Sequence, residues 1–140
     1  MDNAKKEGQI SVEYLVIIGF VTVITIPLII IYYTFTQQSN DEITSSQISQ
    51  ISKKIVDAAE SVYYLGEPSQ ISLRINMPDN VILVNLSSGK EVVFRIRSGR
   101  GEADIVQTTS ANISGSLPTK KGTYAVTIKA MPDYVNASYK

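Results

Sequence analysis

The chain has 140 residues with 13 basic and 13 acidic side chains, and it contains no cysteine, histidine or tryptophan. Without cysteine and histidine, the sequence excludes thiol nucleophiles, disulfides, imidazole catalysis and the usual zinc or haem sites. We find no paired-carboxylate or serine–lysine signature, so we expect no catalytic residues, no metal, no cofactor and no enzyme activity. The formal net charge of zero argues against nucleic-acid binding through bulk electrostatics.

Composition divides the chain into four segments. Residues 1–8 are short and polar, 9–35 are apolar, 36–65 are polar with a helical pattern, and 66–140 are strand-like with frequent turn residues. We therefore expect an α+β fold, with a long N-terminal hydrophobic α-helix, its amphipathic continuation, and a small antiparallel β-sheet or sandwich domain.

The apolar segment is long enough to cross a membrane. No charged residue lies between Glu13 and Asp41, and the stretch 14–35 would form a helix about 33 Å long against a hydrocarbon core of about 30 Å. Lys5 and Lys6 precede it, which favours a cytoplasmic N-terminus and an external remainder. A permanent anchor and a removed secretory signal remain alternatives, but the run exceeds the usual signal core of about 7–15 residues and lacks a following small-residue cleavage site.

Glu13 stands at the start of this apolar segment. Burial of an ionised carboxylate is costly unless a partner neutralises it. Glu13 either lies at the headgroup level, where it suits a helix N-terminus, or pairs with a cation. A free amino terminus created by cleavage a few residues upstream would supply that cation.

Residues 5–15 read Lys-Lys-Glu-Gly-Gln-Ile-Ser-Val-Glu-Tyr-Leu. This run resembles the class III signal peptide of archaeal type IV pilins, which has the pattern Gln-x-Ser-x-Glu-Tyr ahead of a hydrophobic helix. Every fixed position is matched, by Gln9, Ser11, Glu13 and Tyr14. The resemblance implies that a prepilin-type peptidase cuts between Gly8 and Gln9, so that residues 1–8 are a leader and the helix is kept.

The same resemblance implies roles in assembly. Glu13 becomes the fifth residue after such cleavage and would attract the terminal amine of a neighbouring subunit. Cyclisation of Gln9 to pyroglutamate would remove that amine, and both alternatives stay open. The stretch 55–66 also looks like the helix end of archaeal surface proteins that bear this leader. Gly19 and Pro27 are either ordinary features of a membrane helix or the site of a bend or melted turn.

Beyond the apolar segment, hydrophobic residues recur at helical spacing. One row repeats every three or four positions, and a second row widens it. The first row is Ile48, Ile51, Ile55, Ala58, Val62 and Leu65, and the second is Val56, Ala59 and Tyr63. The stripe predicts a helix that packs on its own sheet, with or without further burial against neighbouring subunits.

The C-terminal segment predicts about five short strands separated by turn residues. Alternating apolar residues mark strands at 71–75, 92–96 and 124–130, a buried-looking run covers 81–86, and a weaker strand covers 103–109. Arg95, Arg97 and Arg100 could form a ligand patch, but acidic residues interleave with them. A solvated edge strand is therefore the favoured interpretation.

Three Asn-x-Ser sequons begin at Asn85, Asn112 and Asn136. All three fall in the part expected outside the membrane, so they are candidate N-glycosylation sites. We expect at least one glycan, on a loop such as the one expected to hold Asn112.

Together, the residues and the resemblance indicate a type IV pilin-like protein. The expected function is the major structural subunit of an extracellular adhesion filament, held in the cytoplasmic membrane before assembly. Its partners would be other copies in a helical homopolymer, a prepilin peptidase, the pilus assembly ATPase and the membrane platform protein. The alternatives are a minor pilin or pseudopilin, and a membrane-anchored surface binding domain that does not polymerise.

Overall fold

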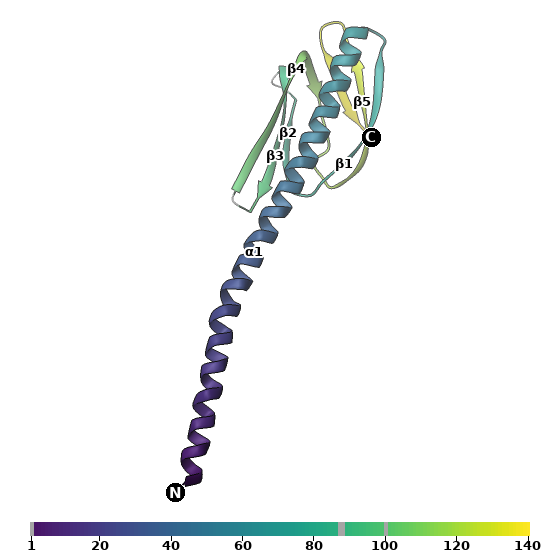
Figure 1. Cartoon of the computed structure of the whole chain (residues 1–140). Coiled ribbons are helices and arrows are strands. Elements are labelled where there is room, and N and C mark those ends of the chain that lie inside the picture. The colour runs from purple at the N-terminus through teal and green to yellow at the C-terminus, as the bar shows by residue number, and fades with distance from the viewer. Residues whose placement is uncertain (1, 87–88, 100) are drawn as a thin grey trace. The chain divides into compact units, whose positions relative to one another are not determined.

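The computed structural model describes residues 2–86, 89–99 and 101–140, with side chains from residue 11 onward. Within these residues, one helix is followed by six strands (Figure 1). The elements are α1 (Asp2–Leu65), β1 (Gln70–Met77), β2 (Val81–Asn85), β3 (Gly89–Ser98), β4 (Gly101–Gly115), β5 (Gly122–Ala130) and β6 (Val135–Tyr139). The expected α+β class is confirmed. The chain forms two compact units that meet between Ser39 and Asn40.

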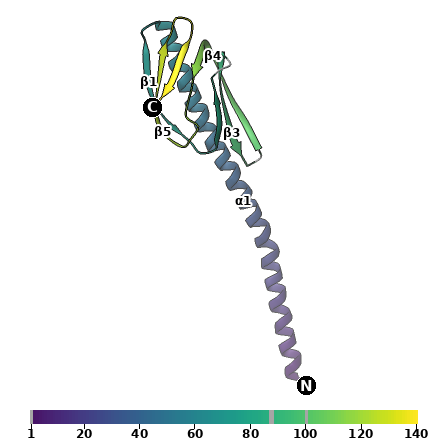
Figure 2. The same cartoon turned by 180° about the vertical axis from the view of Figure 1, so that it is seen from behind.

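The second unit is a single sheet with the C-terminal part of α1 along one face (Figures 1 and 2). The strand order is β1-β5-β6-β4-β3-β2, so β1 and β2 are the sheet edges. Neighbouring strands are antiparallel except for β4 and β6, which pair in parallel through residues 113–115 and 135–137. The domain is therefore one mostly antiparallel sheet and not a sandwich.

The predicted helical stripe supplies the helix side of the core. Seven of its nine residues are buried, namely Ile48, Ile51, Ile55, Val56, Ala58, Ala59 and Val62. Tyr63 and Leu65 are exposed. Gly66 ends the helix with φ 73° and donates its N–H to the Val62 carbonyl oxygen at 3.0 Å, a left-handed cap that glycine favours. The hydrophobic stripe is therefore no longer buried in the last turn of the helix.

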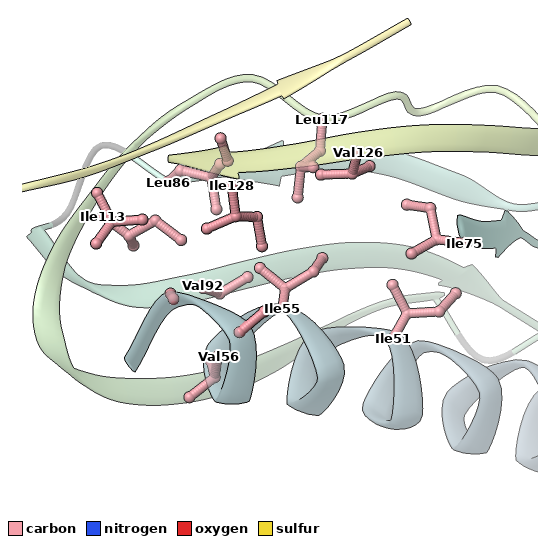
Figure 3. Packing of buried hydrophobic residues seen from close by; sticks show 14 of the residues in the cluster. Ile51, Ile55, Val56, Ile75, Leu86, Val92, Ile113, Leu117, Val126 and Ile128 are labelled. Atoms are coloured by element: carbon pink, nitrogen blue, oxygen red, sulfur yellow. The ribbon is translucent and has the colours of Figure 1, made fainter. Parts of the chain in front are cut away.

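The sheet contributes alternate residues to the same core. Val92, Phe94 and Ile96 of β3 are buried on the helix side, as are Val126 and Ile128 of β5. Figure 3 shows Ile51 and Ile55 of α1 facing the sheet residues Ile75 and Ile128. This packing holds the helix on the sheet without any disulfide.

A serine interrupts the apolar helix face. Ser52 is completely buried, and its Oγ has no hydrogen-bond partner among the described residues. A buried hydroxyl without a partner opposes folding. The apolar spacing gave no signal for this position.

Four expectations about the strands are wrong. A sixth strand, β6, is present, and β4 runs from Gly101 to Gly115 instead of 103–109. The run 81–86 is not uniformly buried, because β2 is an edge strand in which Ile82 and Leu83 are exposed. β3, which carries Arg95 and Arg97, lies between β2 and β4 and is not an edge strand.

Two carboxylates of α1 fasten the helix to β3 and β4. Asp41 accepts hydrogen bonds from the Ser98 hydroxyl at 2.6 Å and the Gly99 N–H at 3.0 Å. Five turns further on, Glu60 accepts the Ser110 N–H at 2.9 Å. This bond from Ser110 holds the pKa of Glu60 below its ordinary value. The apolar contacts are thus supplemented by a polar contact near each end of the packed helix segment.

Candidate functional site

The first unit presents an apolar helix surface. Residues 11–38 are all exposed, and the large hydrophobic side chains from Val12 to Phe35 are between 45% and 73% exposed. Soluble monomers rarely expose more than a few hundred Å² of contiguous apolar surface. This surface therefore needs a lipid bilayer or other protein chains around it.

The polar groups of this segment suit such an environment. The Thr22 hydroxyl donates to the Ile18 carbonyl at 2.8 Å, and the Thr34 hydroxyl donates to the Ile31 carbonyl at 2.9 Å. These bonds lower the cost of placing hydroxyls in hydrocarbon, where water is absent. By length and composition, α1 is able to cross a membrane, which is compatible with membrane insertion.

The residues of the Gln-x-Ser-x-Glu-Tyr motif all lie on α1. Positions 8 and 9 belong to the helix, but their side chains lie outside the described residues. Ser11, Glu13 and Tyr14 are exposed. Positions 9 and 13 are four residues apart and therefore share one helix face, one turn from each other. A partner that meets Glu13 from the side would also meet the position of Gln9.

Gly19 and Pro27 leave α1 unbroken. The α-helix is continuous through Pro27, although proline supplies no N–H for the usual bond to the carbonyl four residues earlier. A Cβ added at Gly19 would meet nothing within 4 Å. Among the described residues, lack of space therefore does not require glycine at position 19.

The three sequon asparagines lie on strands. Asn85 ends β2, Asn112 lies in β4 and Asn136 lies in β6. The expectation that a loop holds Asn112 is wrong, because β4 is longer than its apolar pattern predicts. Asn112 is exposed, whereas Asn85 and Asn136 are half-buried. Ser87, the third residue of the first sequon, is outside the described residues.

One arginine of β3, Arg95, pairs with an acidic residue of β4. Arg95 donates to both carboxylate oxygens of Asp104, from Nε at 2.7 Å and from Nη2 at 2.9 Å. This pairing lowers the pKa of Asp104 and raises that of Arg95. Arg97 is exposed, and Arg100 is outside the described residues. The geometry is that of a solvent-facing ion pair, which commits Arg95 to Asp104 and not to a ligand.

A shallow groove of about 160 Å³ runs between α1 and the edge strand β1. Its lining is mixed polar and apolar: Gln47, Gln50, Ile51, Lys54, Arg74, Ile75 and Asn76. Within the described part of the chain, no three His, Cys, Asp or Glu side chains are grouped so that they could hold a metal ion.

Sequence reasoning missed the two fastening carboxylates, Asp41 and Glu60. Each forms its bonds with residues at least 50 positions away in the chain, so local spacing carries no signal for them. Comparison with protein-family models, curated proteins and solved structures finds no match for this chain.

Proposed function

We propose that this chain is the major structural subunit of an archaeal type IV pilus that serves adhesion. The observation that carries the proposal is the complete Gln-x-Ser-x-Glu-Tyr motif directly ahead of an exposed, charge-free apolar helix segment. A prepilin-type peptidase would cut between Gly8 and Gln9. The assembly ATPase and membrane platform protein would then move the subunit from the cytoplasmic membrane into an extracellular filament.

The exposed helix supplies a physical reason to polymerise. In the membrane, lipid covers side chains 11–38, and in a filament the helices of neighbouring copies would cover them. Each large apolar side chain kept from water contributes about 1.5–3 kcal/mol. Extraction from the bilayer would therefore be tolerated only if other copies replace the lipid.

Glu13 would set the position of one subunit against the next. Once surrounded by helices, its carboxylate is strongly disfavoured unless a cation or hydrogen-bond donor meets it. The amine of a neighbouring Gln9 would meet that need, and a pyroglutamate ring would offer a ring N–H donor instead. Either partner would make the correct axial position of one subunit against the next more stable than a shifted position.

A processing assay tests the first step. The full chain is expressed with an active prepilin-type peptidase, and the N-terminus is read by mass spectrometry. We expect loss of Met1–Gly8 and a new terminus at Gln9. A matched culture with a catalytically inactive peptidase should retain the eight residues.

Two other results would contradict the proposal. Removal of the whole apolar segment would indicate an ordinary secretory signal. A chain that keeps Met1–Gly8 beside an active peptidase would favour the second candidate, a permanently anchored surface domain. That candidate is favoured by one observation, since residues 40–140 close a core of their own and could function without polymerising.

A further inference from the structure

The sheet has one face free of the helix, and the sequon asparagines of β4 and β6 lie on it. In β4, Ala111 and Ile113 are buried towards α1, while Asn112 and Ser114 are exposed. In β6, Val135 and Ala137 are buried on the helix side. Because side chains alternate along a strand, Asn136 lies on the same helix-free face as Asn112.

Asn85 lies on this face as well, but at a distance from the other two. Its register partner on β3 is Val93, which alternates with the buried Val92 and Phe94. β3 separates β2 from β4. One whole strand therefore lies between Asn85 and the nearer of the other two strands.

The parallel pairing of β4 with β6 places the sequons of Asn112 and Asn136 side by side. Ser114, which supplies the hydroxyl of the Asn112 sequon, is the direct register partner of Asn136. Adjacent strands are about 4.8 Å apart and residues rise about 3.3 Å along a strand, so Asn112 and Asn136 lie roughly 8 Å from each other.

A close backbone approach fixes this register. Gly115 pairs with Ala137 and has φ 129°. A Cβ at position 115 would overlap the Ala137 carbonyl group. The next residue continues the contact, because Ser116 donates its N–H to the Ala137 carbonyl oxygen at 3.0 Å. The two strands therefore cannot slip relative to each other without losing these contacts.

We propose that Asn112 and Asn136 are a mutually exclusive pair of N-glycosylation sites, of which each folded chain carries a glycan on one only. A sugar attached to Asn136 would cover Ser114. It would thereby block access of a transferase to the Ser114 hydroxyl, which the enzyme must recognise in the Asn112 sequon. A sugar on Asn112 would crowd Asn136 in turn, because N-glycans are bulky.

The transfer uses a lipid-phosphate-linked oligosaccharide and a membrane-bound transferase. The asparagine side-chain nitrogen forms a bond to the anomeric carbon, and the bond between that carbon and the phosphate oxygen breaks. The lipid phosphate leaves with the electron pair, and the amide proton passes to a base of the transferase. Asn112 is the preferred acceptor because it is exposed, whereas Asn136 is half-buried.

Mutually exclusive glycosylation does not require the chain to polymerise. It requires residues 40–140 to be folded outside the membrane when the sugar is transferred. If the chain does assemble, the helix-free face must stay open to solvent at β4 and β6, and subunit contacts must use other surfaces.

Mass spectrometry of the full chain from its native cells tests the proposal. Trypsin, which cuts after lysine and arginine, places Asn85, Asn112 and Asn136 on the separate peptides 75–90, 101–120 and 130–140. Intact-protein mass then reports how many glycans one chain carries. We expect Asn112 to be more occupied than Asn136, and chains with both modified to be absent.

Variants distinguish mutual exclusion between Asn112 and Asn136 from a simple preference of the transferase for Asn112. Asn112→Gln should raise the occupancy of Asn136, and Ser114→Ala should do the same while keeping Asn112. Asn85→Gln is the matched control and should leave the occupancy of the other two sites unchanged. Chains modified at both Asn112 and Asn136, an unchanged Asn136 occupancy in both variants, or the absence of glycan from both sites would overturn the proposal.

Discussion

Glu13 begins the charge-free segment, and its carboxylate is the group most affected by what surrounds the helix. In the proposed filament, a partner from a neighbouring copy neutralises it. We predict that Glu13→Ala abolishes filaments while cleavage after Gly8 continues, because the register-setting contact is lost. Glu13→Gln should assemble partly, since an amide still accepts a hydrogen bond.

The measurement pairs two readouts on the same cells. Mass spectrometry of the N-terminus reports cleavage, and the amount of subunit in sheared filaments reports assembly. Wild-type filament yield from Glu13→Ala would contradict a role for the carboxylate in assembly. Failure of cleavage in that variant would instead assign Glu13 to peptidase recognition.

Glu60 links helix packing to pH. Its pKa is lowered by the bond from the Ser110 N–H, so the folded state binds its proton less readily than the unfolded state does. This contribution to stability is present above the unfolded value near 4.3 and is lost as pH falls through the lower folded value. Asp104, whose pKa Arg95 lowers, acts in the same direction.

We therefore predict that Glu60→Gln lowers stability at neutral pH and weakens the acid dependence of unfolding. Hydrogen exchange should also show faster exchange at the Ser110 amide. Asp57→Asn is the matched control, because Asp57 is an exposed acid about one turn earlier on α1. Equal effects of the two substitutions, measured by urea unfolding in detergent micelles, would show that the Ser110 bond is unimportant.

At the scale of the elements, the parallel pairing of β4 with β6 depends on Gly115. We predict that Gly115→Ala disrupts this pair, since the added Cβ would overlap Ala137. Gly101→Ala is the control, because Gly101 has a similar φ of 131° but open space around it. Both variants carry backbone strain of about 1–3 kcal/mol, and only Gly115→Ala adds a clash.

Urea unfolding in detergent micelles, with hydrogen exchange across β6, distinguishes the two. Gly115→Ala should show the lower unfolding midpoint and lose amide protection in β6. If both variants unfold at the same midpoint, the close approach of β4 to β6 contributes nothing beyond backbone strain.

The helix and the strongly alternating strands were predictable from sequence because their burial follows a local period. The apolar residues between Ile48 and Val62 recur at helical spacing and are buried. The β3 residues Val92, Phe94 and Ile96 occupy alternate positions and are also buried. β6 escaped prediction because its five residues include only small buried side chains between polar ones. β4 was underestimated because Thr109 and Ala111 are buried without being strongly apolar.

The register between strands could not be predicted from local sequence patterns. The pairing of Ser114 with Asn136 joins residues 22 positions apart, and the bonds of Asp41 and Glu60 join residues more distant still. For the candidate site, the sequence identifies the motif residues and the sequons directly. Only the sheet register brings Asn112 and Asn136 together.

At the scale of the whole molecule, the two units have different needs. Residues 40–140 bury a core of their own, whereas residues 11–38 are exposed along their length. The chain has no net charge, so long-range electrostatic repulsion between copies is weak and does not oppose their association. Lipid before assembly and neighbouring helices afterwards would together meet the needs of the apolar unit.

Electron cryomicroscopy of filaments sheared from the native cells, with the subunit identified from density and mass spectrometry, would show directly whether this chain forms a pilus. We predict helical filaments whose subunits begin at Gln9, with residues 11–38 packed inside and Glu13 facing the terminus of a neighbour. Recovery of the chain only from membranes, with Met1–Gly8 still attached, would contradict this prediction.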